Sequence, residues 1–156
     1  MKKFFLTLAL IITAATQLQA QTVEDFFNAF KDKPGVEYVN IPKAMLSMVA
    51  SASEEQDAKD MMKKLESMTI LEFENNPELQ ALFEKKMDEF ADKAYEELIS
   101  ASEDGEKAKI YVKMKEGSET ISDMVIMSIE KGECTLLQIK GELKVEDVDK
   151  LKALGD

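Results

Sequence analysis

Ser128 and Lys131 are the first candidate for chemistry in this chain, because they have the S-x-x-K spacing of serine acyl-transferases. Those enzymes place the serine at the start of a helix, with partner motifs far along a longer chain. Here the surrounding residues predict that Ser128 lies in a strand and that Lys131 lies in a turn. We therefore interpret the pair as an ordinary strand end and not as a catalytic site.

Two acidic clusters could offer oxygen atoms to Ca²⁺. One is Asp147 with Asp149, and the other is Glu103, Asp104 and Glu106. Neither has the D-x-D-x-D-G spacing of a calcium loop, and acids are common at helix starts and in turns. We favour these structural roles, and a weak divalent-cation site remains an alternative. Paired carboxylates for glycoside chemistry stay open as well, although no pair is singled out.

Cys134 is the only cysteine, so an exported chain of this sequence cannot form an internal disulfide. Its neighbours from Glu133 to Leu137 are typical of a strand. We predict a small, buried and structurally quiet side chain. An intermolecular bridge or a reactive thiol is the alternative.

The absent residue types exclude more chemistry than the present ones suggest. The chain has no histidine and no tryptophan, and every basic residue is a lysine. It therefore has no Ser-His or Cys-His pair, no histidine metal ligand, and no guanidinium fork for phosphate or carboxylate. We assign no catalytic, cofactor-binding or metal-binding residue and no cofactor, and we favour a protein without enzymatic activity.

The first twenty residues have the pattern of a signal peptide. Lys2-Lys3 is followed by the apolar run 4–13, and Ala20 precedes a predicted cleavage site before Gln21. The run is too short to span a membrane, and no cysteine follows it to carry a lipid. We predict residues 1–20 as a signal peptide and 21–156 as one exported, soluble domain that is not a lipoprotein. A buried N-terminal helix is the alternative.

The chain is strongly acidic, with a formal net charge of −11. Loss of Lys2 and Lys3 with the signal peptide would make it more negative by two charges. Nucleic acid and anionic membrane surfaces repel such a chain, so we expect neither as a partner. Solubility is the favoured role of the charge, and binding of a cation or of a protein partner is the other.

The first half of the chain has mainly helical patterns. Thr22 caps a short helix that carries Val23, Phe26, Phe27 and Phe30 on one face. The sequence then predicts a strand at 36–41, a helix from Pro42 with Met45, Met48 and Val49 inward, a helix capped by Ser53 and Gln56, and a strand at 68–74. Asn76 and Pro77 mark the start of the longest helix, 77–94.

The second half has strand patterns and turns. Glu103-Asp104-Gly105-Glu106 joins two strands, 98–102 and 107–115, into a hairpin. In the second strand, apolar residues alternate with lysines. We predict that the helix 77–94 covers the apolar side (Ala108, Ile110, Val112 and Met114), and that the lysine side faces solvent. That lysine side could also be a binding surface for an acidic partner.

Two further strands and a helix complete the pattern. Strand 121–129 is apolar on both faces, which favours a central place in the sheet, and strand 134–141 follows it. A last helix begins near Lys144, with Val145, Val148 and Leu151 inward. Helices first and a strand meander later predict a single α+β domain with an antiparallel sheet packed by helices.

The ten methionines are spread over several predicted elements. Methionine fills irregular gaps in a core, and it also forms binding surfaces that adapt to varied partners or to soft metals. Because these methionines fall at core positions of different elements, we favour gap filling.

The order of segments resembles a known family. The residues that carry the resemblance are Gly35-Val36-Glu37-Tyr38-Val39-Asn40-Ile41-Pro42-Lys43-Ala44-Met45, Gly105-Glu106-Lys107-Ala108-Lys109-Ile110-Tyr111-Val112-Lys113 and Leu136-Leu137-Gln138-Ile139-Lys140-Gly141-Glu142-Leu143. They are similar to a Bacteroidetes family of small exported proteins with a domain of unknown function, number four-two-five-two. The resemblance implies a periplasmic or outer-surface setting in a Gram-negative cell, and it implies no activity and no site residue.

These observations together favour a non-enzymatic, exported interaction module whose partner is another envelope or periplasmic protein. The alternative from a different class is a hydrolase or lyase built from Asp, Glu, Lys, Tyr and Ser. A deep pocket with convergent acids or a desolvated lysine would favour that enzyme.

Overall fold

The computed structural model describes the backbone of residues 22–154 and the side chains of residues 22–150. The predicted signal peptide, residues 1–20, and its cleavage site before Gln21 lie outside the described residues. Within the described part, no helix is both long and apolar enough to cross a membrane.

Six strands form one antiparallel sheet in the order β1-β2-β6-β5-β4-β3. Their bounds are β1 Glu37–Pro42, β2 Leu65–Glu74, β3 Glu96–Glu103, β4 Glu106–Met114, β5 Ile121–Glu130 and β6 Glu133–Leu143. The last four strands are the predicted meander, and β5 is central as its two apolar faces indicate. The chain is thus a single α+β unit, as the sequence predicts.

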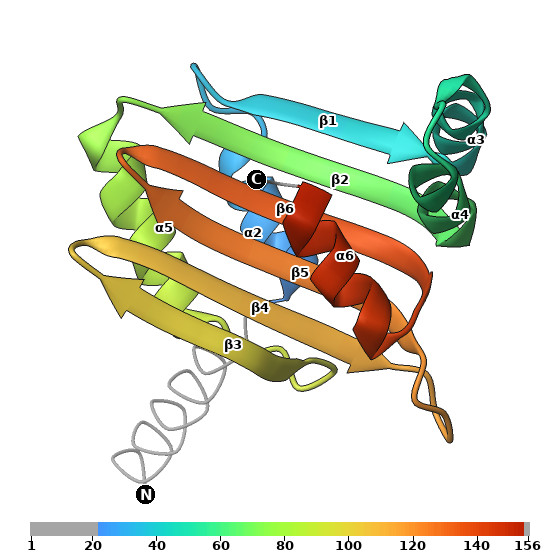
Figure 1. Cartoon of the computed structure of the whole chain (residues 1–156). Coiled ribbons are helices and arrows are strands. Elements are labelled where there is room, and N and C mark those ends of the chain that lie inside the picture. Colours follow the sequence, from blue (N-terminus) through green and yellow to red (C-terminus); the bar gives the residue numbers. More distant parts are fainter. Residues whose placement is uncertain (1–21, 155–156) are drawn as a thin grey trace, which may run out of the picture.

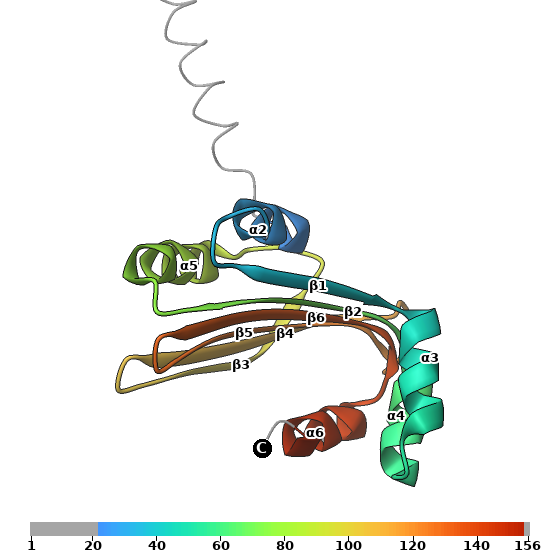
Figure 2. The same cartoon turned by 90° about the horizontal axis from the view of Figure 1, so that it is seen from above.

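Two helices, α2 (Val23–Phe30) and α5 (Pro77–Glu89), cover one face of the sheet, which we call the back face (Figure 2). Thr22 and Asp25 form the capping box of α2, and the Asn76 side chain accepts from the Leu79 N–H at the start of α5. Phe83 of α5 is fully buried, and its ring lies 5.0 Å from that of Phe26 between centroids. Aromatic packing therefore joins the two helices to each other.

The opposite face, which we call the front face, carries α3 (Lys43–Ala52), α4 (Gln56–Lys64) and α6 (Val145–Leu154). Helices α3 and α4 stand at one end of the sheet, and α6 crosses the strands beside them (Figures 1 and 2). The other half of the front face has no helix over it among the described elements (Figure 1). This asymmetry between the two faces determines where a ligand could bind.

Strand β6 passes close to the junction of α4 and β2. A Cβ atom at Gly141 would collide with the backbone carbonyl oxygen of Lys64. Only glycine therefore allows this approach, and the pairing of β2 with β6 shows a register shift between Leu65 and Ser67 at the same place. The close approach brings the end of α4 beside the start of α6.

Several local predictions are wrong. Helix α5 ends at Glu89, so the predicted helix 77–94 is one turn too long. Helix α3 buries Leu46 and Ala50, whereas Met45, Met48 and Val49 are about half exposed or more.

The N-cap of α4 is Glu55, without a side-chain hydrogen bond, in place of the predicted cap at Ser53. In α6, Val148 is buried but Val145 is exposed. In a short helix, the apolar residues fit the helical period in more than one way. The period alone therefore does not determine which side of the helix is buried.

The predicted packing of the longest helix is also wrong. Helix α5 lies over the side of β4 that carries Lys107, Lys109 and Tyr111, and not over the Ala108–Met114 row. Ile110 and Val112 belong to the cluster on the front face. The apolar row therefore lies on the face that carries α3, α4 and α6, and no described helix lies over its end near the β3–β4 turn (Figure 1).

Candidate functional site

A cavity of about 830 Å³ lies on the front face. Its floor is the apolar side of five strands, β1, β2, β4, β5 and β6, and its walls come from α3, α4 and α6. Aliphatic and methionine side chains form nearly all of the lining: Ile41, Leu46, Val49, Ala58, Met61, Met62, Leu65, Met68, Ile70, Ile110, Met124, Ile126, Leu137, Ile139 and Val148. A concave site with such a lining suits an apolar ligand.

The floor follows directly from strand alternation. Ile70 pairs with Leu137, Leu137 with Ile126, and Ile126 with Ile110 across four neighbouring strands. A residue of one strand and its partner on the next point to the same face, so this register places four apolar side chains in one row. Ile70, Leu137 and Ile126 are only partly buried, and the row therefore remains accessible from solvent.

Among the residues that the structure describes, only two polar side chains line the cavity, Ser128 and Thr135, which are cross-strand neighbours. Lys131 lies beyond Ser128 in the β5–β6 turn, with a positive φ of 50°. The predicted strand position of Ser128 and turn position of Lys131 are thus confirmed. No titratable side chain lines this cavity among the described residues, so the cavity itself has no group for general acid–base catalysis.

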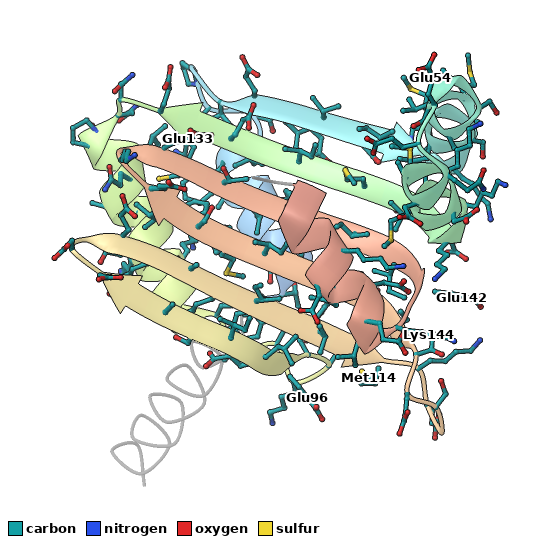
Figure 3. The ribbon with its side chains drawn as sticks, in the orientation of Figure 1. Glu54, Glu96, Met114, Glu133, Glu142 and Lys144 are labelled. Atoms are coloured by element: carbon teal, nitrogen blue, oxygen red, sulfur yellow. The ribbon has the colours of Figure 1, made fainter. Side chains whose placement is uncertain are left out.

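Glutamates occupy one end of the front face, where the β3–β4 and β5–β6 turns lie. We call it the hairpin end. Glu74 pairs with Glu133, Glu133 with Glu130, and Glu103 with Glu106. Glu106 precedes Lys107, which pairs with Ile129, and this places Glu106 beside Glu130. We call these five residues the glutamate row. Figure 3 shows Glu133 at this end, with Met114 and Lys144 at the opposite end of the sheet.

A polar cluster lies on the back face beside α2. The Gln138 amide donates to Tyr95 Oη at 3.3 Å and to Asp123 Oδ1 at 3.1 Å. Burial raises the pKa of Asp123, although the nearby Lys140 and Lys113 oppose the shift. Burial and the charge of Asp123 raise the pKa of Tyr95. These groups line a polar depression of about 450 Å³.

The lysine side of β4 is largely covered by α5, so the prediction that this side faces solvent is wrong. Lys107 Nζ lies 2.6 Å from Glu84 Oε1 and 3.5 Å from Asp88 Oδ2, and Lys109 Nζ lies 3.7 Å from Asp88 Oδ1. The hydrogen bond to Glu84 raises the pKa of the Lys107 ammonium. The two lysines are therefore engaged by α5, whereas Lys113 and Lys115 of the predicted lysine side are exposed.

Other candidate residues from the sequence have structural roles. Cys134 is fully buried on the back face, as predicted. Burial, followed by the charges of Glu133 and Glu84, raises the pKa of its thiol to about 11. Asp104 and Gly105 form the turn of the β3–β4 hairpin with positive φ. Among the described side chains, residues 22–150, no three Asp, Glu or Cys residues are grouped as metal ligands.

Asp147 is a buried carboxylate that fixes the first turn of α6. It accepts from Lys64 Nζ at 2.9 Å and from the Lys144 backbone N–H at 2.8 Å. Burial by itself raises the pKa of Asp147, but these two hydrogen bonds outweigh it, and the net shift is below the ordinary value. The pair joins the end of α4 to the start of α6 at the wall of the cavity.

The cavity is the feature that sequence reasoning missed. Met61, Met62, Met68 and Met124 line it, whereas the sequence analysis favoured methionines as core filler. One signal could have revealed it: the apolar rows of β4 and β5 need more cover than one long helix and four short ones can give. Which face lacks cover depends on helix placement, and local periodicity does not contain that information.

No curated protein and no solved structure is significantly similar to this chain. The family model described as a domain of unknown function (DUF4252) matches residues 30–151, which includes every strand and most of the helices described above. The chain therefore belongs to the DUF4252 family.

Proposed function

We propose that this chain is an exported, non-enzymatic binding module of the Gram-negative envelope, and that the front cavity is its binding site. The apolar cavity of about 830 Å³ carries the proposal. Its lining combines four methionines with branched aliphatic residues, and methionine adapts its shape to varied ligands. The described lining has hydroxyls but no acid, base or nucleophile–base pair, and such a lining suits binding better than catalysis.

Binding of the uncharged dye Nile red tests this proposal. Exchanging the neighbours Ile126→Thr and Leu137→Thr removes apolar area from the exposed floor, while threonine still suits a strand. We expect the double variant to bind Nile red about tenfold more weakly than the wild type. The control variant Met45→Thr with Leu98→Thr changes two exposed apolar residues outside the cavity and should bind as the wild type does. Equal binding by all three proteins would contradict the proposal.

Export is a separate part of the proposal, and it is supported by the Lys2-Lys3 start and the apolar run that follows. We expect the native protein isolated from its cell envelope to begin at Gln21 without a fatty-acyl group. Mass spectrometry of the intact protein checks this expectation. A chain that still begins at Met1, or an added acyl mass, would contradict it.

An acid-based hydrolase or lyase is the second candidate, and the Tyr95–Asp123–Gln138 cluster is the observation that favours it. A carboxyl group whose pKa is raised by burial can act as a general acid or base. Nitrophenyl esters and glycosides are suitable substrates for a screen. We expect no turnover above the buffer rate, and turnover that disappears in Asp123→Asn would establish the enzyme in place of the binding module.

A further inference from the structure

We infer that the cavity and the glutamate row together receive a basic amphipathic helix of a partner protein. Its apolar side would lie on the row formed by Ile70, Leu137 and Ile126, and its lysines or arginines would lie over the glutamates at the hairpin end. This inference rests on the proposed binding function and deepens it by naming the class of ligand.

The polarity of the floor favours a helix over an extended peptide. A bound polypeptide must find partners for every backbone N–H and C=O that it removes from water. The described lining offers only the hydroxyls of Ser128 and Thr135. An α-helix satisfies its backbone internally, and an amphipathic helix can place one apolar side in a groove. Helix α6 already packs in this way on the same face through Val148.

The glutamate row determines the charge of the partner. Glu103, Glu106 and Glu130 line a shallow depression of about 220 Å³, which shares Ser128 with the apolar cavity. Glu133 and Glu74 continue the row across β6 and β2. None of the five forms an ion pair with a described residue. Lys107 also borders the depression, but its ammonium is engaged by Glu84 on the back face.

The same row disfavours two other occupants. An acyl chain with an anionic head group would place like charge beside the glutamates. A second copy of this chain would bring its own glutamate row and a further net charge of −11 to the interface. A positively charged apolar helix meets attraction at the hairpin end and an apolar surface along the floor.

Two designed peptides of about five helical turns test the inference. Both carry the same leucine stripe, and one has lysines where the other has glutamates at one end. We expect the lysine peptide to bind the mature protein more tightly by about tenfold at low ionic strength, and the difference to shrink as salt is added. Fluorescence anisotropy of labelled peptides gives both affinities.

Variants locate the contact. The triple variant Glu103→Gln, Glu106→Gln and Glu130→Gln should weaken the lysine peptide by about tenfold and leave Nile red binding unchanged. The matched control neutralises three exposed glutamates elsewhere, Glu24, Glu116 and Glu119, and should retain the affinity for the peptide. Urea unfolding of both variants shows whether each one is folded.

The outcomes separate the two proposals. Equal binding of the lysine and glutamate peptides, or an equal effect of the two triple variants, would overturn the basic helix. Binding of Nile red or of a fatty acid without binding of the lysine peptide would overturn the helix and leave the apolar cavity as a small-molecule site. Failure of every probe to bind would overturn the binding function itself.

Discussion

At the scale of residues, the Glu84–Asp88 pair shows how two like charges that are unfavourable in an isolated helix are neutralised in the fold by Lys107. Glu84 and Asp88 are like charges one turn apart on α5, which weakens an isolated helix. In the structure Lys107 lies within 4 Å of both carboxylates. The lysines of β4 and the acids of α5 thus neutralise each other, and sequence reasoning on either element alone could not pair them.

Cys134 should react very slowly with thiol reagents in the native protein. Burial raises the pKa of its thiol from 9.0 to about 11, so the reactive thiolate at neutral pH falls by about 100-fold. We expect the labelling rate to be lower than that of the urea-unfolded chain by at least this factor, and to rise with pH through the range below 11. A native rate equal to that of the unfolded control would contradict the buried position.

At the scale of elements, α5 is the principal packing element of the back face. Phe83 contacts the rings of Phe26, Phe30 and Phe73, so it joins α5 to α2 and to β2. Apolar residues recur at helical spacing in the sequence of this segment, at Leu79, Leu82, Phe83, Met87 and Phe90, and this stripe is the side that packs on the back face. The Asn76-Pro77 cap correctly predicts where the helix starts. Neither signal predicts which side of β4 the helix covers.

Truncation of Phe83 to alanine should cost about 3–5 kcal/mol of the free energy of unfolding, because it leaves a cavity among three other aromatic rings. Equilibrium urea unfolding measures this cost. The control Lys85→Ala lies on the exposed side of the same helix and should change stability by less than about 0.5 kcal/mol. A neutral Phe83→Ala would show that α5 does not pack as described.

At the scale of the whole molecule, the two faces of the sheet differ in how they are closed. The back face is closed by an aromatic cluster, and among the described elements the front face is covered at one end alone, by α3, α4 and α6. The Lys64–Asp147 pair joins segments that are far apart in the sequence and fixes the position of α6. Stability of this end should therefore depend on pH.

The variant Asp147→Asn should lose about 1 kcal/mol of stability at neutral pH, since Lys64 is partly exposed and solvent screens the pair. The pKa of Asp147 in the folded state lies below its ordinary value. The pair therefore stabilises the fold above the unfolded-state pKa of about 4, and this contribution disappears as pH falls through the lower folded-state value.

Urea unfolding at neutral pH and near pH 3 checks this dependence. The difference between wild type and Asp147→Asn should shrink at the lower pH. The exposed neighbour provides a control, because Glu146→Gln should change stability by less than about 0.5 kcal/mol. An equal loss in Asp147→Asn at both values would mean that the carboxylate charge is not what stabilises α6.

The sequence by itself determined the α+β class, the strand meander, the caps at Thr22 and Asn76, the burial of Cys134 and the family. These features depend on local signals: alternation, capping residues, turn glycines and segment order. Only the tertiary structure decided that β2 pairs with β6, that α5 covers the lysine side of β4, and that the opposite apolar row forms an open cavity with glutamates at its end. Each of these depends on contacts between segments far apart in the chain. When both faces of a strand can pack against a helix, the sequence of the strand does not determine which face the helix will cover.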